Sequence, residues 1–417
     1  MLDRRTLLVR TGAALAAGGL GAAFADLEEV AAAPEADAAI DWAGVRRQFR
    51  LAPGWVHMSG LYLASHPAAV RRALARHRRG LDANPVHYLH ERGPQLEAAV
   101  LRAAGAYLRA RPADIALTDS TTMGLGLLYN GIELRAGQEA LTTTHDFYAT
   151  HEALRLKAAR SGASVRRVRL YRDARRASVD EIVSSLVAAV GPRTRVIALT
   201  WVHSITGVKL PLARIARALG ERRRDVLLCV DGVHGLGVEN ATLGSLGCDF
   251  FVAGCHKWLF GPRGTGLVWG RGPVWDAVDP TIPSFSGSAT PGAEMTPGGF
   301  HSFEHRWALA EAFRLHLRIG KARVARRIHA LNTRLKAGLA SMPHVTLVTP
   351  QSTALSAGLV CFTVDRMSPG AVVEALRRRR VIATVTPYDP PYARLAPGLL
   401  NTPADVDRAL RAVRSLR

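Results

Sequence analysis

Short apolar runs alternate with amphipathic stretches over the first two thirds of the chain. Seven runs rich in β-branched and other apolar residues predict strands, at 114–118, 139–143, 164–170, 195–201, 226–230, 250–254 and 265–269. The stretches between them predict helices, at 122–130, 151–161, 179–190 and 212–223. The run at 226–230 is apolar at every position, as is typical of a parallel strand with both faces covered. The pattern predicts an α/β fold with three layers around a mainly parallel, seven-stranded sheet.

The pattern changes after about residue 290. A segment rich in Pro, Gly and Ser at 283–299 leads into a long helical stretch from 305 to 340. Further strands are predicted at 345–348, 358–364 and 381–385, and further helices at 369–379 and 403–415. We therefore predict a large domain at 51–290 and a smaller α+β domain at 291–417.

The first 25 residues have the pattern of an export signal. Arg4 and Arg5 precede an apolar stretch at 7–23 that four glycines interrupt, and Ala23-Phe24-Ala25 forms a small-residue cleavage site. The arginine pair resembles a twin-arginine signal, which implies the twin-arginine translocase as a partner and a periplasmic location. An ordinary secretory signal is the alternative. Residues 26–50 are expected to form a linker, and we expect no membrane span in the mature protein because the apolar stretch is short and interrupted.

Composition and charge narrow the class of protein. The 417 residues are 48% hydrophobic and 21% charged, which excludes a disordered or fibrous chain. The formal net charge of +21 suggests a polyanionic partner, but the arginines are spread along the chain without the basic, aromatic-interleaved stripe of nucleic-acid-binding proteins. We expect no nucleic-acid partner, and a non-catalytic basic protein that binds anionic polymers of the cell envelope remains an alternative. Only five of the 55 basic residues are lysines, which limits where amine chemistry can reside.

Two of the predicted strands end in residues that can carry chemistry. Asp231-Gly232-Val233-His234 follows the strand at 226–230, and Cys255-His256-Lys257-Trp258 follows the strand at 250–254. The carboxyl ends of parallel strands meet at one edge of a sheet, where ligands collect. A lysine and a carboxylate there suit a cofactor with an aldehyde and a ring nitrogen, because the amine can bind the aldehyde as a Schiff base while the carboxylate keeps the nitrogen protonated.

Together with further motifs, this pair resembles the class V family of aminotransferases, which have the aspartate aminotransferase fold (fold type I) and use pyridoxal 5′-phosphate (PLP). The resemblance covers roughly residues 50–415. Asn84-Pro85-Val86-His87-Tyr88 and the segment at 142–148 resemble the isopenicillin N epimerase-like branch. The final motif begins at Arg394 and continues with Asn401-Thr402-Pro403.

The resemblance implies a role for each matching residue. Lys257 would bind the cofactor and act as the catalytic acid and base, and Asp231 would contact the ring nitrogen. The other expected cofactor contacts are Thr121 and Thr122 at the phosphate, His145 over the ring, His234 at the ring oxygen, and His256. Arg394, assisted by Ser204, would bind the substrate α-carboxylate in a bidentate pair. No metal site is predicted.

Several positions depart from the family pattern. Asp119 and Met123 replace an asparagine and a glycine in the phosphate turn, and Gly254 replaces a serine three residues before Lys257. Cysteine desulfurases of the class carry a nucleophilic cysteine shortly before the carboxylate arginine, but the stretch 385–394 contains none. We therefore expect no persulfide on the protein.

The implied reaction begins when the amine of an amino acid, free or carried by a peptide, displaces Lys257 and forms its own imine with the cofactor. Loss of the Cα proton can then lead to epimerisation, to transamination or, as in C–S lyases, to elimination of a β-substituent. Exported members of this branch resemble periplasmic enzymes that tailor a side chain of a siderophore peptide. The resemblance also implies a homodimer, with the segment Thr296-Pro297-Gly298-Gly299 crossing to the partner.

Overall fold

The computed structural model describes residues 40–220, 225–286 and 289–416. The predicted signal at 1–25 lies outside the described residues, as does most of the predicted linker. The first described helix is α2 (Trp42–Arg47), which lies within the end of that linker. Along the described part of the chain, no helix combines the length and the apolar character that crossing a bilayer requires.

The seven predicted strands form one sheet, in the order β2-β8-β7-β6-β5-β3-β4. β8 runs antiparallel to both of its neighbours, and the other neighbouring pairs are parallel. The strands are β2 (Ile115–Thr118), β3 (Glu139–Thr143), β4 (Ser164–Val168), β5 (Thr194–Thr200), β6 (Leu227–Asp231), β7 (Phe250–Gly254) and β8 (Gly266–Gly270). The predicted mainly parallel, seven-stranded sheet is therefore confirmed.

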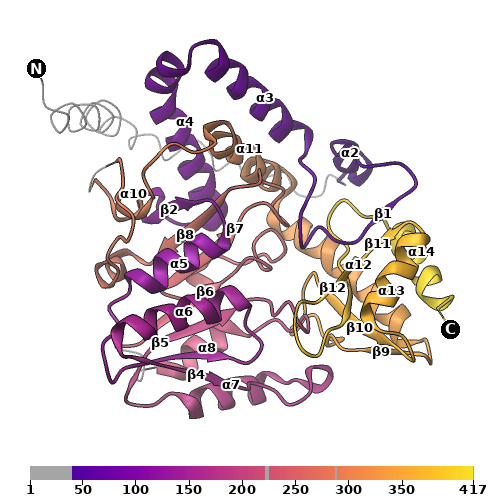
Figure 1. Ribbon diagram of the computed structural model, residues 1–417. Helices are drawn as coiled ribbons and strands as arrows, with labels where there is room; N and C mark the ends of the chain where they lie inside the picture. Colours follow the sequence, from indigo (N-terminus) through magenta and orange to yellow (C-terminus); the bar gives the residue numbers. More distant parts are fainter. Residues whose placement is uncertain (1–39, 221–224, 287–288, 417) are drawn as a thin grey trace, which may run out of the picture.

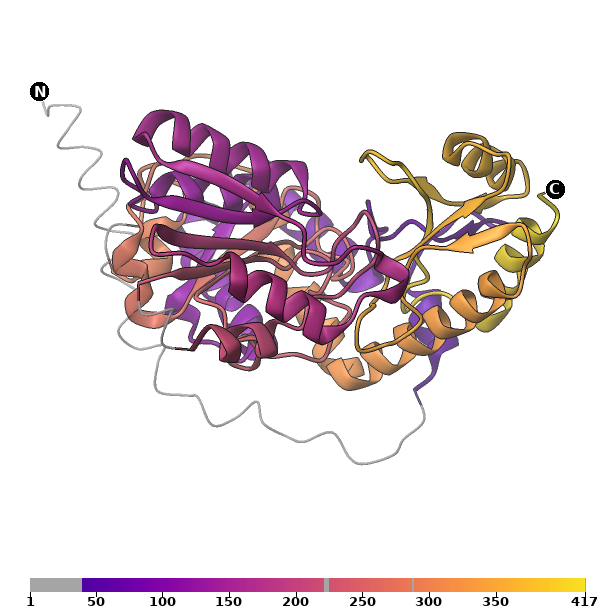
Figure 2. The ribbon, with the colours of Figure 1, turned by 90° about the horizontal axis from the view of Figure 1, so that it is seen from below.

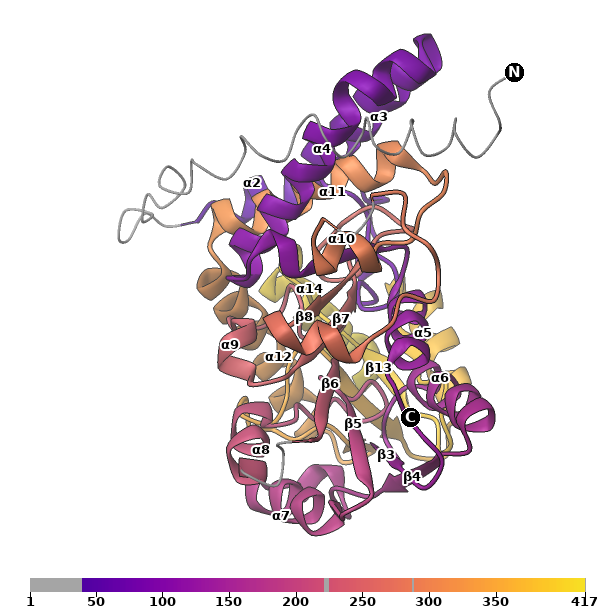
Figure 3. The same ribbon diagram turned by 90° about the vertical axis from the view of Figure 1, so that its left-hand side faces the viewer.

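Helices cover both faces of this sheet, which gives the three predicted layers. In β6, Leu228 and Val230 belong to one apolar cluster and Leu227 and Cys229 to the other, because alternate side chains point to opposite faces. One face packs against α5 (Thr121–Gly131), α6 (Tyr148–Ser161) and α10 (Pro291–Met295). The other face packs against α4 (Pro85–Leu108), α7 (Val179–Ala189), α8 (Leu212–Leu219), α9 (Leu243–Leu246) and α11 (Phe303–Ile319). Figure 3 shows the strands between α5 and α6 on one side and α8 and α9 on the other.

The N-terminal helices form a hairpin beside this body. α3 (Ala68–Ala83) and α4 are antiparallel neighbours that pack against α11, and their connection extends away from the sheet (Figure 1). Asn84 forms that connection, since it follows the last residue of α3 and precedes Pro85, the first residue of α4.

The C-terminal part contains a second, antiparallel sheet in the order β12-β13-β10-β9. Its strands are β9 (Val345–Leu347), β10 (Val360–Val364), β12 (Thr384–Val385) and β13 (Ala393–Leu395), and a separate pair joins β1 (Val56–His57) to β11 (Val381–Ile382). Three helices pack on these strands: α12 (Lys321–Ala340), α13 (Pro369–Arg378) and α14 (Pro403–Arg414). Figure 2 shows this α+β part beside the large sheet. Because β1 pairs with β11, residues that precede α3 contact the C-terminal part. The division into a large domain at 51–290 and a small domain at 291–417 stays a prediction.

Two elements of this part differ from the sequence-based prediction. The helical stretch expected from 305 to 340 is two helices, separated by Gly320 at a φ of 91°, a backbone angle that favours glycine. The strand expected at 381–385 is divided into β11 and β12, which pair with different neighbours.

Candidate active site

Asp231 is the last residue of β6 and is almost fully buried, with 1% of its surface exposed. Its Oδ1 accepts a hydrogen bond from the backbone N–H of Val233 at 3.1 Å. Its Oδ2 is buried and contacts no hydrogen-bond donor among the described residues. Burial raises the pKa of this carboxyl to about 6, although Val233 and the charge of Lys257 act in the opposite direction. The free oxygen is therefore suited to a cationic N–H donor, which would offset the cost of burying the charge.

Lys257 follows β7, the strand beside β6, so that its amine reaches the same edge of the sheet as Asp231. Asp231 pairs in register with Val252, five residues before the lysine. Burial lowers the pKa of Lys257 to about 8; Asp231 counteracts this shift, and the charge of Arg394 adds to it. A large fraction of the amine is thus neutral near pH 8, as a nucleophile or a proton acceptor must be.

His234 lies in the turn after β6, where its tautomer is fixed by Trp258. Nε1 of Trp258 donates a hydrogen bond to Nδ1 of His234 at 3.2 Å. Burial holds the pKa of His234 well below its usual value, so the ring is neutral and its single proton is on Nε2. His234 can therefore donate one hydrogen bond from Nε2 to an oxygen in the site.

The N-terminus of α5 lies beside the end of β7. Oγ1 of Thr121 accepts a hydrogen bond from the N–H of Gly254 at 2.8 Å, and Thr122 is exposed. Nδ1 of His256 is buried and contacts no partner among the described residues. A β-carbon at position 254 would lie 3.0 Å from both Oγ1 of Thr121 and Cε1 of His256, so a serine there would require these two side chains to move. Hydroxyls, an imidazole and a helix N-terminus together are suited to an anion.

Arg394 lies on β13 and is 3% exposed. Its Nη1 donates to the backbone carbonyl of Ser204 at 2.8 Å, and its Nε donates to Oγ1 of Thr384 at 3.0 Å. Within the described ranges, no ion pair joins this guanidinium to a carboxylate. Oγ of Ser204 is 2.6 Å from the hydroxyl of Tyr388. A buried arginine with unused donors is suited to a carboxylate ligand, which would compensate for its desolvation.

Asp146 is a buried residue that the sequence analysis did not single out. It accepts hydrogen bonds from the N–H groups of Thr200 and Thr143, both at 2.6 Å, and from Oγ1 of Thr142 at 2.7 Å. Burial alone would raise the pKa of this carboxyl, but His203 and these donors outweigh it and lower the pKa to about 2. The charged Asp146 thereby joins the end of β3 to the end of β5.

His145, which the family resemblance places over the cofactor ring, stacks on an aromatic residue of the chain itself. Its ring stacks on Tyr171, with ring centroids 4.1 Å apart, and its polar neighbours are Thr144 and His203. The ring of Phe147 instead lies edge-on to Tyr388, with centroids 6.3 Å apart, and Tyr388 is bound to Ser204. Of these two residues, Phe147 is therefore the one that contacts Tyr388, the neighbour of Ser204.

The four cysteines of the chain are all buried. Burial raises the pKa of Cys361 to about 11 and that of Cys255 still further. Buried thiols with raised pKa values are poor nucleophiles. The absence of a persulfide on the protein stays a prediction.

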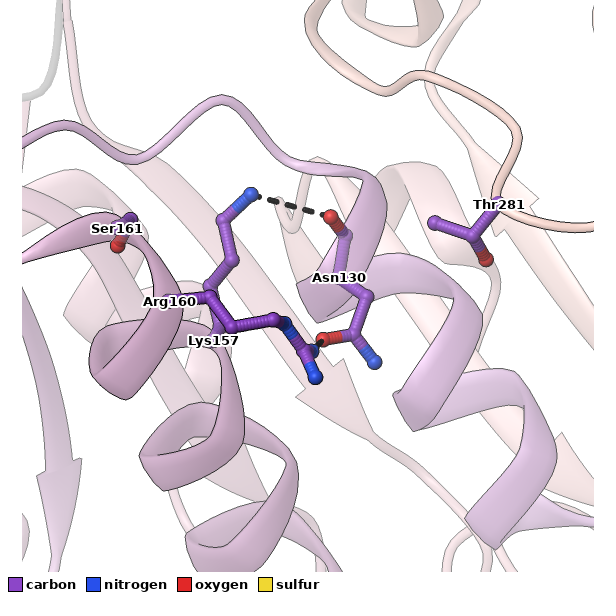
Figure 4. A pocket seen from close by; sticks show the side chains of 5 residues that line it. All are labelled: Asn130, Lys157, Arg160, Ser161 and Thr281. Carbon is purple, nitrogen blue, oxygen red and sulfur yellow. Dashed lines mark hydrogen bonds between the residues drawn. The ribbon is translucent and has the colours of Figure 1, made fainter.

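A separate cavity of about 380 Å³ lies at the other end of α5 (Figure 4). Its lining residues are Asn130, Lys157, Arg160, Ser161 and Thr281. Lys157 donates to the backbone carbonyl of Asn130 at 3.1 Å, and Arg160 contacts the side chain of the same residue. Because α5 is 11 residues long, this cavity lies about 16 Å from Thr121, and it belongs to a different part of the molecule.

Comparison with known proteins shows the family of this chain. A model of the class V aminotransferases matches residues 64–386. The chain belongs to this family. Isopenicillin N epimerases from Streptomyces clavuligerus and Amycolatopsis lactamdurans are 27% and 28% identical to it, over 91% and 90% of this chain and 99% and 98% of their own. A probable cysteine desulfurase from Pseudomonas aeruginosa is 29% identical, over 75% of this chain and 79% of its own.

Solved structures of the class V type have the same fold. The cystine C-S lyase C-DES, in complex with its reaction product cysteine persulfide, aligns with a TM-score of 0.79 at 23% identity over 87% of this chain and 98% of that one. A cysteine desulfurase from Thermococcus onnurineus NA1 aligns with a TM-score of 0.80 at 19% identity, over 91% and 98% of the two chains. The fold is the PLP fold type I, as predicted.

This class V enzyme depends on PLP, and its residues fit that cofactor. The unpartnered Oδ2 of Asp231 matches the protonated ring nitrogen, and Nε2 of His234 matches the ring oxygen. The amine of Lys257 matches the aldehyde, and the corner of Thr121, Thr122 and His256 matches the phosphate. These contacts remain assignments by chemistry and position.

Proposed function

We propose that this enzyme removes the Cα proton of an amino acid, free or carried by a peptide, and that Lys257 is the group that moves this proton. The observation that carries the proposal is the position of Arg394. This buried guanidinium donates hydrogen bonds to Ser204 and Thr384 and to no carboxylate of the described chain. A substrate carboxylate there would fill its remaining donor positions and fix the orientation of Cα.

The chain's own residues divide the work. PLP, when bound, supplies an electron-accepting ring that stabilises negative charge at Cα. Asp231 keeps the proton on the ring nitrogen, since its buried carboxylate is stabilised by a cation beside it. Lys257 accepts and returns the Cα proton, because burial lowers its pKa to about 8. We assign the contact with the ring face to Phe147 in place of His145, on the basis of its contact with Tyr388.

Epimerisation is the specific outcome that we rank next. It is supported by the two isopenicillin N epimerases, which match nearly the whole of this chain as well as nearly the whole of their own. Transamination would require the same proton to be returned to the cofactor instead of to Cα. We keep both substrate forms expected from the sequence: a free amino acid, and an amino acid that is part of a larger molecule such as a siderophore peptide.

The proposal is tested by incubating the holoenzyme with a panel of L-amino acids in D₂O and following the Cα proton by NMR. Chiral chromatography and assays for keto acid and ammonia then identify the outcome. The Lys257→Ala variant should exchange no proton.

Lys321→Met is the matched control for Lys257→Ala. Burial also lowers the pKa of Lys321 to about 8, but its amine binds the backbone carbonyls of Tyr107 and Ala241. Exchange that persists in Lys257→Ala, or that is lost equally in the control, would contradict the proposal.

We propose that the enzyme is a homodimer. Support comes from an aromatic patch made by Phe285, Phe300 and Phe303, in which Phe300 is 85% exposed and Phe285 56% exposed. Exposed aromatic clusters of this kind typify protein interfaces. The patch includes residues on both sides of the segment expected to cross to the partner. Sedimentation analysis should give twice the chain mass, and Phe300→Asp should shift the enzyme towards monomer.

We also propose export through the twin-arginine translocase to the periplasm. The support is the sequence pattern at 1–25 alone. Fractionation of cells that express the full chain should place the protein in the periplasm, and the double substitution Arg4→Lys with Arg5→Lys should retain it in the cytoplasm. Unchanged export of the double variant would contradict the twin-arginine route.

A further inference from the structure

A second cavity, of about 520 Å³, lies beside the active site at the same edge of the large sheet. It is bounded by residues that follow β3, β4 and β5 and by residues of the small sheet. The lining residues that matter here are His145, Arg169, Tyr171, Arg172, Thr206 and Tyr392. We call this space the arginine cavity.

The charge of the arginine cavity is positive. Arg169 and Arg172 are both exposed, and neither guanidinium forms an ion pair or a hydrogen bond with another residue that the structure describes. A third lining arginine, Arg175, is already engaged, because it contacts both oxygens of Asp173 at 2.8–3.1 Å. Asp389 is the other carboxylate in the lining. Two free guanidinium groups at one hollow favour an anionic ligand, and their planar donors suit a carboxylate.

The wall of the arginine cavity is held by buried contacts. The hydroxyl of Tyr171 lies 3.0 Å from Nδ1 of His203 and 2.8 Å from Oγ1 of Thr206. His203 is fully buried beside Asp146, at 3.5 Å, and His145 stacks on the Tyr171 ring. His203 is not among the expected cofactor contacts. In this network it contacts Tyr171 and Asp146 instead. The network also makes the wall a fixed surface, as a binding site needs.

Two short segments connect the arginine cavity with the carboxylate site. Ser204 contacts Arg394, whereas Ile205 and Thr206, the next residues, line the cavity. Tyr388 likewise contacts Ser204, and the next two residues, Asp389 and Pro390, line the cavity. Since neighbouring strands lie about 4.8 Å apart, β3 and β4 are about 10–15 Å from β6 and Asp231. A group bound in the cavity must therefore be several bonds away from the reacting Cα.

We propose that the arginine cavity binds a carboxylate at the far end of the substrate, so that the enzyme acts on an amino acid whose side chain is extended and ends in an anion. This inference rests on the proposed function, because Arg394 must hold the α-carboxylate at the same time. A chain of three residues spans about 10 Å and reaches from one site to the other. Arg169 and Arg172 act here as specificity residues and take no part in the proton transfer.

The probe is γ-L-glutamylglycylglycine, which carries a free α-amine, a free α-carboxylate and a distant terminal carboxylate. Its comparison partner is the same peptide with a C-terminal amide. We expect the holoenzyme to bind the free acid at least tenfold more tightly than the amide in equilibrium dialysis, since a charge-assisted contact is lost. Arg169→Gln with Arg172→Gln should remove this preference and leave the affinity for the amide unchanged. Arg176→Gln is the matched control, because Arg176 is equally exposed on the same segment and does not line the cavity.

Two readouts separate this inference from the proposed function. Cα-proton exchange of either peptide in D₂O tests the proposed function, whereas the difference in affinity between acid and amide tests the arginine cavity and needs no turnover. Equal affinities for acid and amide, or a preference that survives the double arginine substitution, would overturn the inference even if both peptides exchange. A preference that the double substitution abolishes supports it even if exchange is absent.

Discussion

Nη1 of Arg394, on β13 of the small sheet, donates a hydrogen bond to the backbone carbonyl of Ser204, which follows β5 of the large sheet, at 2.8 Å. This bond holds the guanidinium at the edge of the large sheet where Asp231 ends β6 and Lys257 follows β7. It uses a backbone acceptor and leaves other donors of the guanidinium for a ligand. The carboxylate site that we propose for the substrate therefore lies where the two sheets meet.

Replacing Arg394 by lysine should weaken binding of amino-acid substrates. The lysine keeps the charge but loses the planar donors of a bidentate pair, so KM should rise about tenfold to 100-fold. Steady-state kinetics of Cα-proton exchange measures this change. Arg411→Lys, on the exposed side of α14, is the control and should leave KM unchanged. An unchanged KM in Arg394→Lys would remove Arg394 from the substrate site.

Loading of the apoenzyme with PLP should accelerate as the pH rises through about 8, because the neutral amine of Lys257 is the nucleophile and its pKa is lowered to about 8. In Asp231→Asn the midpoint should move to lower pH, since the carboxylate that raises the lysine pKa is gone. Stopped-flow absorbance at each pH gives both midpoints. A midpoint near the usual lysine value of 10.5, or an upward shift in the variant, would contradict the assigned environment.

The hydrogen bond between Trp258 and His234 can be measured with a pair of tryptophan variants. Trp258→Phe leaves Nδ1 of His234 without its hydrogen-bond donor. Trp307→Phe is the control: Nε1 of Trp307 is buried and has no partner in the described structure, so this substitution breaks no hydrogen bond. The loss in free energy of unfolding should be larger for Trp258→Phe by about 1 kcal/mol or more. Urea unfolding of both apoproteins tests this, and equal losses would argue against a fixed His234 tautomer.

Phe147 and His145 can be compared at the cofactor. Phe147→Ala should weaken PLP binding and shift the visible absorbance of the holoenzyme, because the contact that we propose between Phe147 and the ring face would be lost. His145→Ala should leave the absorbance unchanged, since His145 stacks on Tyr171. The opposite pattern would restore His145 to the role that the family resemblance implies for it.

The cysteines should be inert in the folded enzyme. Iodoacetamide at pH 8 should label none of Cys229, Cys248, Cys255 and Cys361, and all four should react in urea, because each is buried. Mass spectrometry of the intact protein counts the labels. Rapid labelling of one cysteine with loss of activity would favour a thiol nucleophile and the desulfurase type of chemistry.

The sequence predicted the centre of the large sheet well because β6 and β7 are nearly continuous apolar runs, as buried strands with both faces covered need to be, whereas the edge strand β4 is mostly exposed and contains Arg166 and Arg167. The positions of Asp231 and Lys257 followed directly, since both residues come at or after the carboxyl ends of predicted strands. For these strands and residues, the local pattern of apolar and polar positions was enough to predict their place in the fold.

Long-range contacts explain what the sequence did not reveal. β13, which carries Arg394, is three residues long and is defined by its pairing with β10 and β12. The choice between His145 and Phe147 depends on Asp146, which accepts from N–H groups of β3 and β5 and so sets the direction of its two neighbours. The arginine cavity likewise forms between two sheets, and no single segment of sequence contains it.

The most direct test of the account is reduction of the holoenzyme with borohydride, followed by proteolysis and mass spectrometry. We expect one phosphopyridoxyl group, on Lys257, and none in the Lys257→Ala variant. A group on any of the other four lysines, or no group on a protein that was supplied with PLP, would contradict the active site described above.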